Sequence, residues 1–325
     1  MRILSGMQPT GLLHLGNYEG ALRNWVELQK DNEMFCCIVD WHALTTQYED
    51  PSHIADNARQ VAIDYLAAGL DPEGCAIFLQ SHVKEHAELF LLLSMITPQG
   101  WLERVPTYKD KKDQLDSEDS IPFGLLGYPV LMSADILLYK ADSVPVGKDQ
   151  LPHIELARET VRRFNHLYRE VFPEPHGLLR EGVEVLPGLD GRKMSKSYGN
   201  TILMSDGPDI IRQKVRTMFT DPEKIRMGDP GHPEICPVYA YQRVYQPEKA
   251  EEIASGCRAG TLGCVADKKD LAEAIIRALA PVHERRRDLE ARPEYVEEIL
   301  RAGAARARGV AEATMAEVRD AMGLR

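Results

Sequence analysis

The sequence lacks the features of a membrane or exported protein. No apolar run approaches the ~18 residues that a membrane-spanning helix needs, and no basic segment followed by an apolar stretch opens the chain. We therefore expect no membrane partner and no export. Cysteine is sparse, with six residues in 325, which predicts reduced thiols in a cytoplasmic protein rather than a disulfide framework.

Positive charge is also in deficit. The formal net charge is −11, which argues against indiscriminate nucleic-acid binding and against DNA as a partner. A local basic face can still contact RNA phosphates. The remaining composition, with 44% hydrophobic and 27% charged residues, is typical of a globular protein, and the length predicts two domains.

Apolar runs and helical spacings alternate through the first half of the chain. Runs at 35–39, 76–79, 144–146 and 183–185 predict buried strands, and the spacing within 18–28, 52–69, 132–139 and 151–164 predicts helices. This alternation predicts an α/β fold with a parallel sheet. Beyond residue 209 the chain is mostly helical, most clearly over 294–322, so we place a domain boundary between 186 and 209.

Residues 84–126 interrupt this alternation. An apolar helix over 87–96 precedes a polar stretch, outside the rhythm of the sheet. Two interpretations remain open: the segment forms a subunit interface, or it is a helical cap over the sheet.

The stretch from Ser5 to Asn17 predicts a nucleotide site. An apolar run ends in a Gly/Pro/Thr cluster, and His14-Leu15-Gly16-Asn17 opens a helix. A turn from a strand into a helix N-terminus directs amide N–H groups and the helix dipole at a phosphate. The alternative is that Asn17 only caps the helix and His14 faces solvent.

A second stretch, Lys193-Met194-Ser195-Lys196-Ser197, lies far along the chain. Together the two stretches resemble the two signatures of class I aminoacyl-tRNA synthetases. The chain is most similar to bacterial-type tryptophanyl-tRNA synthetases, on the residues Ser-Gly-Met-Gln-Pro-Thr-Gly (5–11), Tyr-Pro-Val-Leu-Met-Ser-Ala-Asp-Ile-Leu (128–137) and Val-Pro-Val-Gly-Lys-Asp-Gln (144–150).

This resemblance implies a Rossmann-like catalytic domain over 1–190, with 84–126 at a homodimer interface, and a lysine loop with a helical tRNA-binding domain over 191–325. It implies a tryptophan–tRNA ligase, which forms tryptophanyl-adenylate and pyrophosphate from tryptophan and Mg²⁺–ATP and then acylates tRNA(Trp). The tyrosyl enzyme is the nearest alternative. A non-catalytic paralogue that binds tRNA or a protein partner is another.

The resemblance also implies site residues. His14, Asn17, Lys193 and Lys196 would be catalytic, the two lysines neutralising charge on the leaving pyrophosphate. The ATP site would comprise Gln8, Pro9, Thr10, Gly16, Asn17, Gly147, Lys148, Asp149, Val185, Lys193, Met194, Ser195, Lys196 and Ser197. The tryptophan site would comprise Gly6, His42, Tyr128, Met132, Asp135, Val144, Val146 and Gln150.

The resemblance implies that Asp135 accepts a hydrogen bond from the indole N–H and selects the amino acid. Asp135 lies in an otherwise apolar stretch, so its carboxylate needs either water or a partner, and an indole N–H is a lone donor that matches it. The alternative for Asp135 is a charge on an exposed helix face. His42, which follows a predicted strand, is either a pocket residue or a structural histidine.

The cysteines fall into two groups. Cys36, Cys37 and Cys75 accompany predicted core strands. Cys236, Cys257 and Cys264 resemble a region in which some tryptophanyl enzymes bind an iron–sulfur cluster through four cysteines, but Asp267 stands in the fourth position. Three thiolates and one carboxylate make a poorer metal or cluster site than four thiolates, so the alternative is a relic site of free thiols. Candidate tRNA phosphate contacts are Arg212, Lys214, Arg216, Arg285, Arg286 and Arg287.

Overall fold

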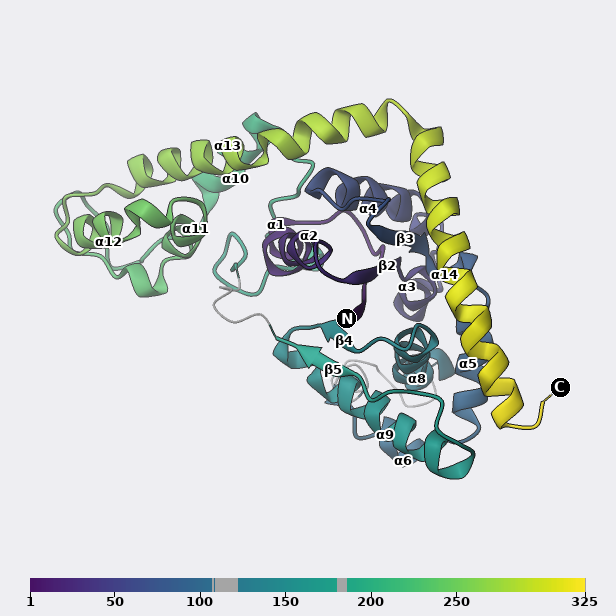
Figure 1. Cartoon of the computed structure of the whole chain (residues 1–325). Helices are drawn as coiled ribbons and strands as arrows, with labels where there is room; N and C mark the ends of the chain where they lie inside the picture. The colour runs from purple at the N-terminus through teal and green to yellow at the C-terminus, as the bar shows by residue number, and fades with distance from the viewer. Residues whose placement is uncertain (107, 109–121, 180–185, 325) are drawn as a thin grey trace.

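A five-stranded parallel sheet forms the centre of the molecule (Figure 1). The structure is a computed structural model and describes residues 1–106, 108, 122–179 and 186–324. In the spatial order β3-β2-β1-β4-β5, the strands are β1 (Arg2–Met7), β2 (Glu33–Ile38), β3 (Cys75–Leu79), β4 (Ser143–Pro145) and β5 (His176–Leu178). The sequence did not predict β5, and the strand expected at 183–185 lies outside the described residues.

The strands read as continuous apolar runs because both faces of the sheet are covered. Alternate residues of one strand enter different cores, as Cys36 and Cys37 do in β2 and Ile77 and Phe78 do in β3. Helices therefore have to cover both faces, and the α/β prediction is confirmed.

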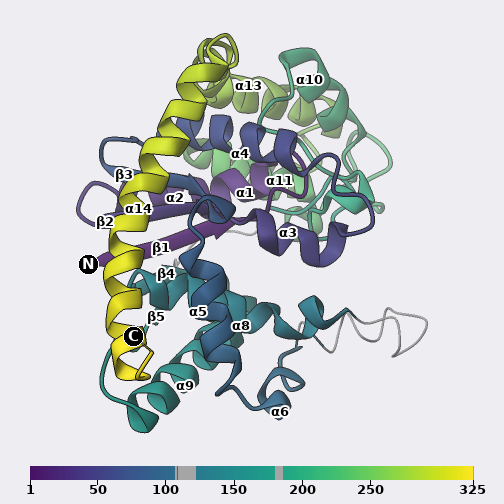
Figure 2. The ribbon, with the colours of Figure 1, turned by 90° about the vertical axis from the view of Figure 1, so that its right-hand side faces the viewer.

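Helices of the first half of the chain surround the sheet (Figure 2). They are α1 (Leu15–Asn17), α2 (Arg23–Leu28), α3 (Asp40–Gln47), α4 (Ile54–Ala68), α5 (Glu85–Ser94), α6 (Gln99–Leu102), α8 (Phe123–Leu138) and α9 (Leu151–Leu167). A π-helical turn over Tyr18–Leu22 joins α1 to α2. The first helices and α4 pack on one face, whereas α5, α8 and α9 pack on the other.

The last third of the chain is helical, as predicted: α10 (Pro208–Thr217), α11 (Pro237–Tyr245), α12 (Ala250–Arg258), α13 (Cys264–Glu290) and α14 (Pro293–Ala321). In Figure 1, α10, α11 and α12 form a lobe beside the sheet, and α13 runs from this lobe to α4. None of the helices in the described part is long and apolar enough to cross a membrane.

The C-terminal helix returns to the sheet, which the sequence did not predict. Helix α14 packs along β3, and a Cβ on Gly303 would clash with the carbonyl oxygen of Ile77. Only glycine permits this approach of helix to strand. The segment after residue 190 therefore comprises a lobe and a helix that belongs to the packing of the sheet.

A buried ion pair joins α13 to α4. The guanidinium of Arg286 donates to the carboxylate of Asp64 and also to Gln60 and Glu290, and Arg286 is 4% exposed. The prediction that Arg286 contacts tRNA phosphate is wrong, because this side chain is committed to the interior. Arg285 donates to the carbonyl oxygen of Ala67.

Candidate active site

The two signature stretches lie side by side in the structure. The Leu15 amide donates to the carbonyl oxygen of Ile202 at 2.9 Å, and the Met204 amide donates to that of Leu13 at 2.9 Å. Lys196 Nζ donates to the carbonyl oxygen of Gly11 at 2.7 Å. Segments nearly two hundred positions apart thus form one turn-and-loop unit beyond β1.

His14 and Asn17 form a reciprocal cap at the start of α1. The Asn17 amide donates to His14 Nδ1 at 3.3 Å, and the His14 amide donates to Asn17 Oδ1 at 3.1 Å. Since Nδ1 accepts, Nε2 is the ring nitrogen that carries the proton. Burial and the charge of Lys196 lower the pKa of His14 to about 4, so the ring is neutral near pH 7. Asn17 therefore does take part in the cap, and the partly buried His14 does not simply face solvent.

The lysine loop packs on this turn through Met194 and Lys196. Met194 is buried, and a Cβ on Gly16 would lie 3.4 Å from its sulfur and 3.0 Å from the His14 ring. Burial lowers the pKa of Lys196 to about 8. Lys193 is exposed, and its carbonyl oxygen accepts from Asn200 Nδ2 at 3.2 Å.

Asn200 organises the loop, and sequence reasoning missed it. Its Oδ1 accepts from the Ser195 amide at 2.9 Å, and its Nδ2 donates to Asp190 at 2.8 Å. Gly199 beside it adopts a left-handed conformation with φ 62°. The Gly199-Asn200 pair directly after the lysine stretch was the available signal in the sequence, because both residues are typical of turns.

A cavity of about 310 Å³ opens beside this unit, at the carboxyl end of β1 and β4. Parallel α/β sheets place ligands at this edge. All eight residues predicted for tryptophan line the cavity: Gly6, His42, Tyr128, Met132, Asp135, Val144, Val146 and Gln150. Gln8 and Gly147, predicted for ATP, line it as well, so the two predicted sites adjoin.

Asp135 is 4% exposed, and both of its carboxylate oxygens accept hydrogen bonds. His42 Nε2 lies 2.8 Å from Oδ2, while Gln80 Nε2 and His86 Nδ1 each lie 2.7 Å from Oδ1. Burial acts to raise the pKa of Asp135, but His86 and His42 outweigh it and lower the pKa to about 2. Asp135 is therefore an ionised carboxylate in the cavity wall and not a charge on an exposed face. His42 is both a pocket residue and a structural partner.

Gln80 and His86 were missed by sequence reasoning. Gln80 follows β3 directly, just as Asp40 and His42 follow β2. Since the carboxyl ends of parallel strands meet at one edge, polar residues after β3 could have been included in the predicted site.

The other predicted ATP residues lie around the same edge. Pro9 and Thr10 follow β1; Lys148 and Asp149 belong to the short helix Lys148–Gln150 after β4; and Ser197 lies in the short helix Lys196–Tyr198. Gln150 Nε2 donates to Asp149 Oδ2 at 3.1 Å. Val185 lies outside the described residues.

The three lobe cysteines do not fit an iron–sulfur cluster. Among the described residues, no three His, Cys, Asp or Glu side chains are arranged to hold a metal ion. Asp267 accepts from Gln242 Nε2 at 2.7 Å, and burial raises the pKa of both Asp267 and Cys236. Lys224 donates to the carbonyl oxygen of Cys257 and brings a positive charge beside that thiol.

Known proteins share both the sequence and the fold. Residues 1–280 match the family model described as tRNA synthetases class I (W and Y). A tryptophan–tRNA ligase of Thermotoga maritima is 51% identical over 327 aligned residues, covering 100% of this chain and 99% of the relative, and one of Aquifex aeolicus is 46% identical over the full length of both chains. The crystal structure of Campylobacter jejuni tryptophanyl-tRNA synthetase complexed with ADP and tryptophan has a TM-score of 0.89, with 36% identity and full coverage of both chains.

A parallel sheet whose first strand-to-helix turn meets a distant lysine loop defines a class I aminoacyl-tRNA synthetase. Archaeal tyrosyl-tRNA synthetases share this fold at 23% identity or less. On the full-length matches above, the chain belongs to the tryptophanyl-tRNA synthetase family.

Proposed function

We propose that this chain is a tryptophan–tRNA ligase, which activates L-tryptophan with ATP and transfers it to the 3′ end of tRNA(Trp). The observation that carries the proposal is the cavity beside the two signatures, with an ionised carboxylate in its wall. This arrangement offers an acceptor for an indole N–H next to a site for the triphosphate.

In this proposal the protein supplies position and charge. The tryptophan carboxylate attacks the α-phosphorus of ATP in line, and pyrophosphate leaves. Lys196 and Lys193 neutralise the charge that grows on the pyrophosphate. Neutral His14 donates through Nε2–H toward the phosphates, and Mg²⁺ arrives with ATP as part of that substrate.

Asp135 favours tryptophan over tyrosine as the amino acid. If a bound amino acid has no N–H at this position, the buried carboxylate of Asp135 is left without a hydrogen-bond donor. Sites of this kind discriminate against such a substrate by a factor of up to ~10⁵ in kcat/KM. Met132, Val144 and Val146 supply apolar walls for a ring.

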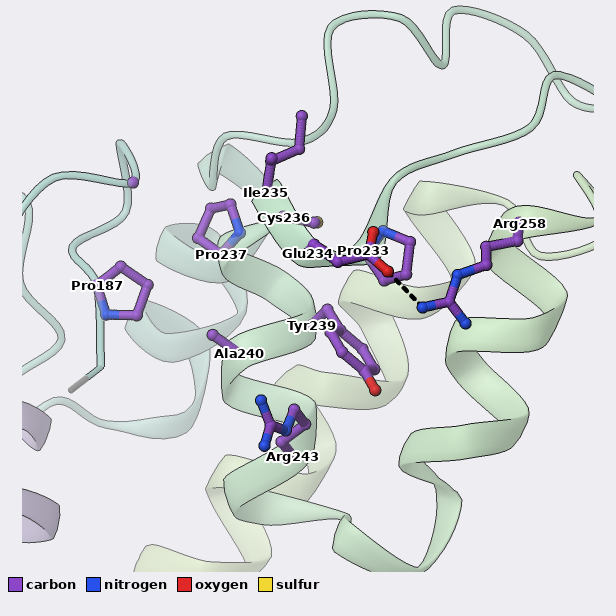
Figure 3. Close-up of a pocket in the computed structure, with 11 residues that line it drawn as sticks. Pro187, Pro233, Glu234, Ile235, Cys236, Pro237, Tyr239, Ala240, Arg243 and Arg258 are labelled. Atoms are coloured by element: carbon purple, nitrogen blue, oxygen red, sulfur yellow. Dashed lines mark hydrogen bonds and ion pairs between the residues drawn. The ribbon is translucent and has the colours of Figure 1, made fainter. Parts of the chain in front are cut away.

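For tRNA we favour the lobe formed by α10, α11 and α12. A second pocket of about 580 Å³ lies there, lined on one side by Tyr239, Arg243 and Arg258 (Figure 3). An aromatic ring beside guanidinium groups suits an unstacked RNA base and its phosphate. Arg258 also pairs with Glu234, and exposed Arg216 and Arg287 remain candidates for phosphate contact.

We further propose a homodimer, built on the segment over 84–126, in the cytoplasm where tRNA is acylated. Leu91 and Met95 of α5 and Phe123 at the start of α8 are large apolar side chains exposed by 52%, 68% and 69%. Exposed apolar residues gathered on one insertion favour a protein interface. Residues 107 and 109–121 of this segment lie outside the described part.

ATP–pyrophosphate exchange with each of the twenty amino acids tests the function. We expect exchange that depends on tryptophan, followed by acylation of tRNA(Trp). Exchange supported equally by tyrosine would contradict the specificity. Binding of tRNA without any exchange would identify a non-catalytic paralogue instead.

A further inference from the structure

Two of the three partners of Asp135 lie behind the cavity wall. His86 on α5 and Gln80 after β3 are both fully buried, and neither lines the cavity. Both donate to the same oxygen of Asp135, Oδ1, at 2.7 Å. They therefore act on the carboxylate from the side opposite to a bound substrate.

The positions of these donors determine which oxygen remains available. An ionised carboxylate has about four acceptor positions, two on each oxygen. His86 and Gln80 fill both positions of Oδ1, whereas among the described residues only His42 donates to Oδ2. The acceptor position open to a substrate therefore belongs to Oδ2, the oxygen bonded to the cavity-lining His42.

His86 connects this carboxylate to the sheet. An ionised oxygen only accepts, so His86 Nδ1 carries the proton that faces Asp135. On the other side of the ring, His86 Nε2 lies 2.7 Å from the hydroxyl oxygen of Tyr139. In the neutral ring Nε2 carries no proton, so it accepts a hydrogen bond from the Tyr139 hydroxyl. Tyr139 stacks on Phe35 of β2 with ring centroids 4.5 Å apart and meets Phe78 of β3 edge-on at 5.7 Å.

We propose that His86, together with Gln80, is a positioning residue for substrate selection: it holds Oδ1 so that Oδ2 presents one acceptor position to the ring N–H of the amino acid. The proposal rests on tryptophan being the substrate. Selectivity for a ring N–H donor then depends on a side chain that never touches the substrate.

The test compares tryptophan with β-(3-benzothienyl)alanine, in which sulfur replaces the indole N–H. We measure kcat/KM for both in pyrophosphate exchange and take their ratio. His86→Leu removes the donor to Oδ1, and we expect the ratio to fall by ~10–10², the usual effect of losing a hydrogen bond to a charged group. His86→Asn keeps an amide donor near the position of Nδ1 and should keep the ratio close to that of the wild type.

A merely structural role predicts something else. If His86→Leu lowers kcat/KM by the same factor for both amino acids, or leaves the ratio unchanged, the proposal is wrong. Should His86→Leu fail to fold, Gln80→Met removes the other donor to Oδ1 and decides in the same way. Wild-type protein without tryptophan-dependent exchange contradicts the proposed function itself and the positioning role with it; wild-type exchange with an unchanged ratio in the variants contradicts only the positioning role.

Discussion

Two of the buried aspartates, Asp135 in the cavity wall and Asp64 between α4 and α13, differ in how their partners treat the charge. They are 4% and 1% exposed, yet their pKa values move in opposite directions. The pKa of Asp135 falls to about 2, whereas burial raises the pKa of Asp64 to about 6 although Arg286 lies directly beside it.

The partners of the two carboxylates explain the difference. Asp135 has donors on both oxygens, and two of them are imidazoles. Asp64 shares the guanidinium of Arg286 with Gln60 and Glu290. The backbone of Leu13 and the charge of Lys196 also favour its ionised form, but the loss of hydration outweighs all of these. Imidazole donors on both oxygens therefore keep Asp135 ionised, whereas a guanidinium shared with two other side chains does not offset the burial of Asp64.

Removal of Asp135 should have the largest effect on activity. We expect Asp135→Ala to lower kcat/KM for tryptophan by up to ~10⁵, because the indole N–H loses its acceptor. The KM for ATP should change little. Steady-state exchange kinetics measures both, with Asp56→Asn on the exposed face of α4 as the control. Equal losses for tryptophan and ATP would make Asp135 a structural residue like Asp64.

Removal of Arg286 should have the largest effect on stability. Arg286→Met leaves Asp64 buried without its cation and should cost about 3–5 kcal/mol in the free energy of unfolding. The double variant Asp64→Leu, Arg286→Met should recover much of this loss, because no uncompensated charge remains. Urea unfolding measures the difference; a double variant no more stable than Arg286→Met would contradict this account of the pair.

Lys196 links the two regions. Its ammonium contacts Gly11 of the first signature, and Asp64 opposes the effect of burial on its pKa. We expect Lys196→Ala to lower kcat for activation by ~10²–10³, about 3–4 kcal/mol, through loss of charge stabilisation on pyrophosphate. Lys30→Ala removes an exposed lysine paired with Glu27 away from the cavity and is the matched control. An equal effect of both substitutions would contradict a special role for Lys196.

Local patterns predicted one of the two aspartates and not the other. Asp135 stands out as the charge within an apolar stretch, and the signature residues and strands β1 to β4 follow from apolar runs and short motifs. The partners Gln80 and His86 lie 55 and 49 positions from Asp135, and Arg286 lies 222 positions from Asp64. No local pattern records such pairings, so the sequence placed Arg286 among the candidate contacts for tRNA phosphate instead of in the interior. The short edge strand β5 offers only three residues of pattern.

The pH dependence of stability separates the two carboxylates directly. Asp64 binds its proton more tightly in the folded state, where its pKa is about 6, than in the unfolded state, where it is ~3.9. The free energy of unfolding should therefore decline by about 3 kcal/mol as pH rises from ~4 to ~6. Asp135 binds its proton less tightly in the folded state than in the unfolded state. Its contribution to the free energy of unfolding should therefore be lost as pH falls from ~4 to ~2. Urea unfolding at stepped pH should show that Asp64→Asn removes the first change and Asp135→Asn the second, while Asp56→Asn removes neither. Parallel curves for Asp64→Asn and the wild type between pH 4 and 6 would mean that Arg286 keeps Asp64 ionised after all.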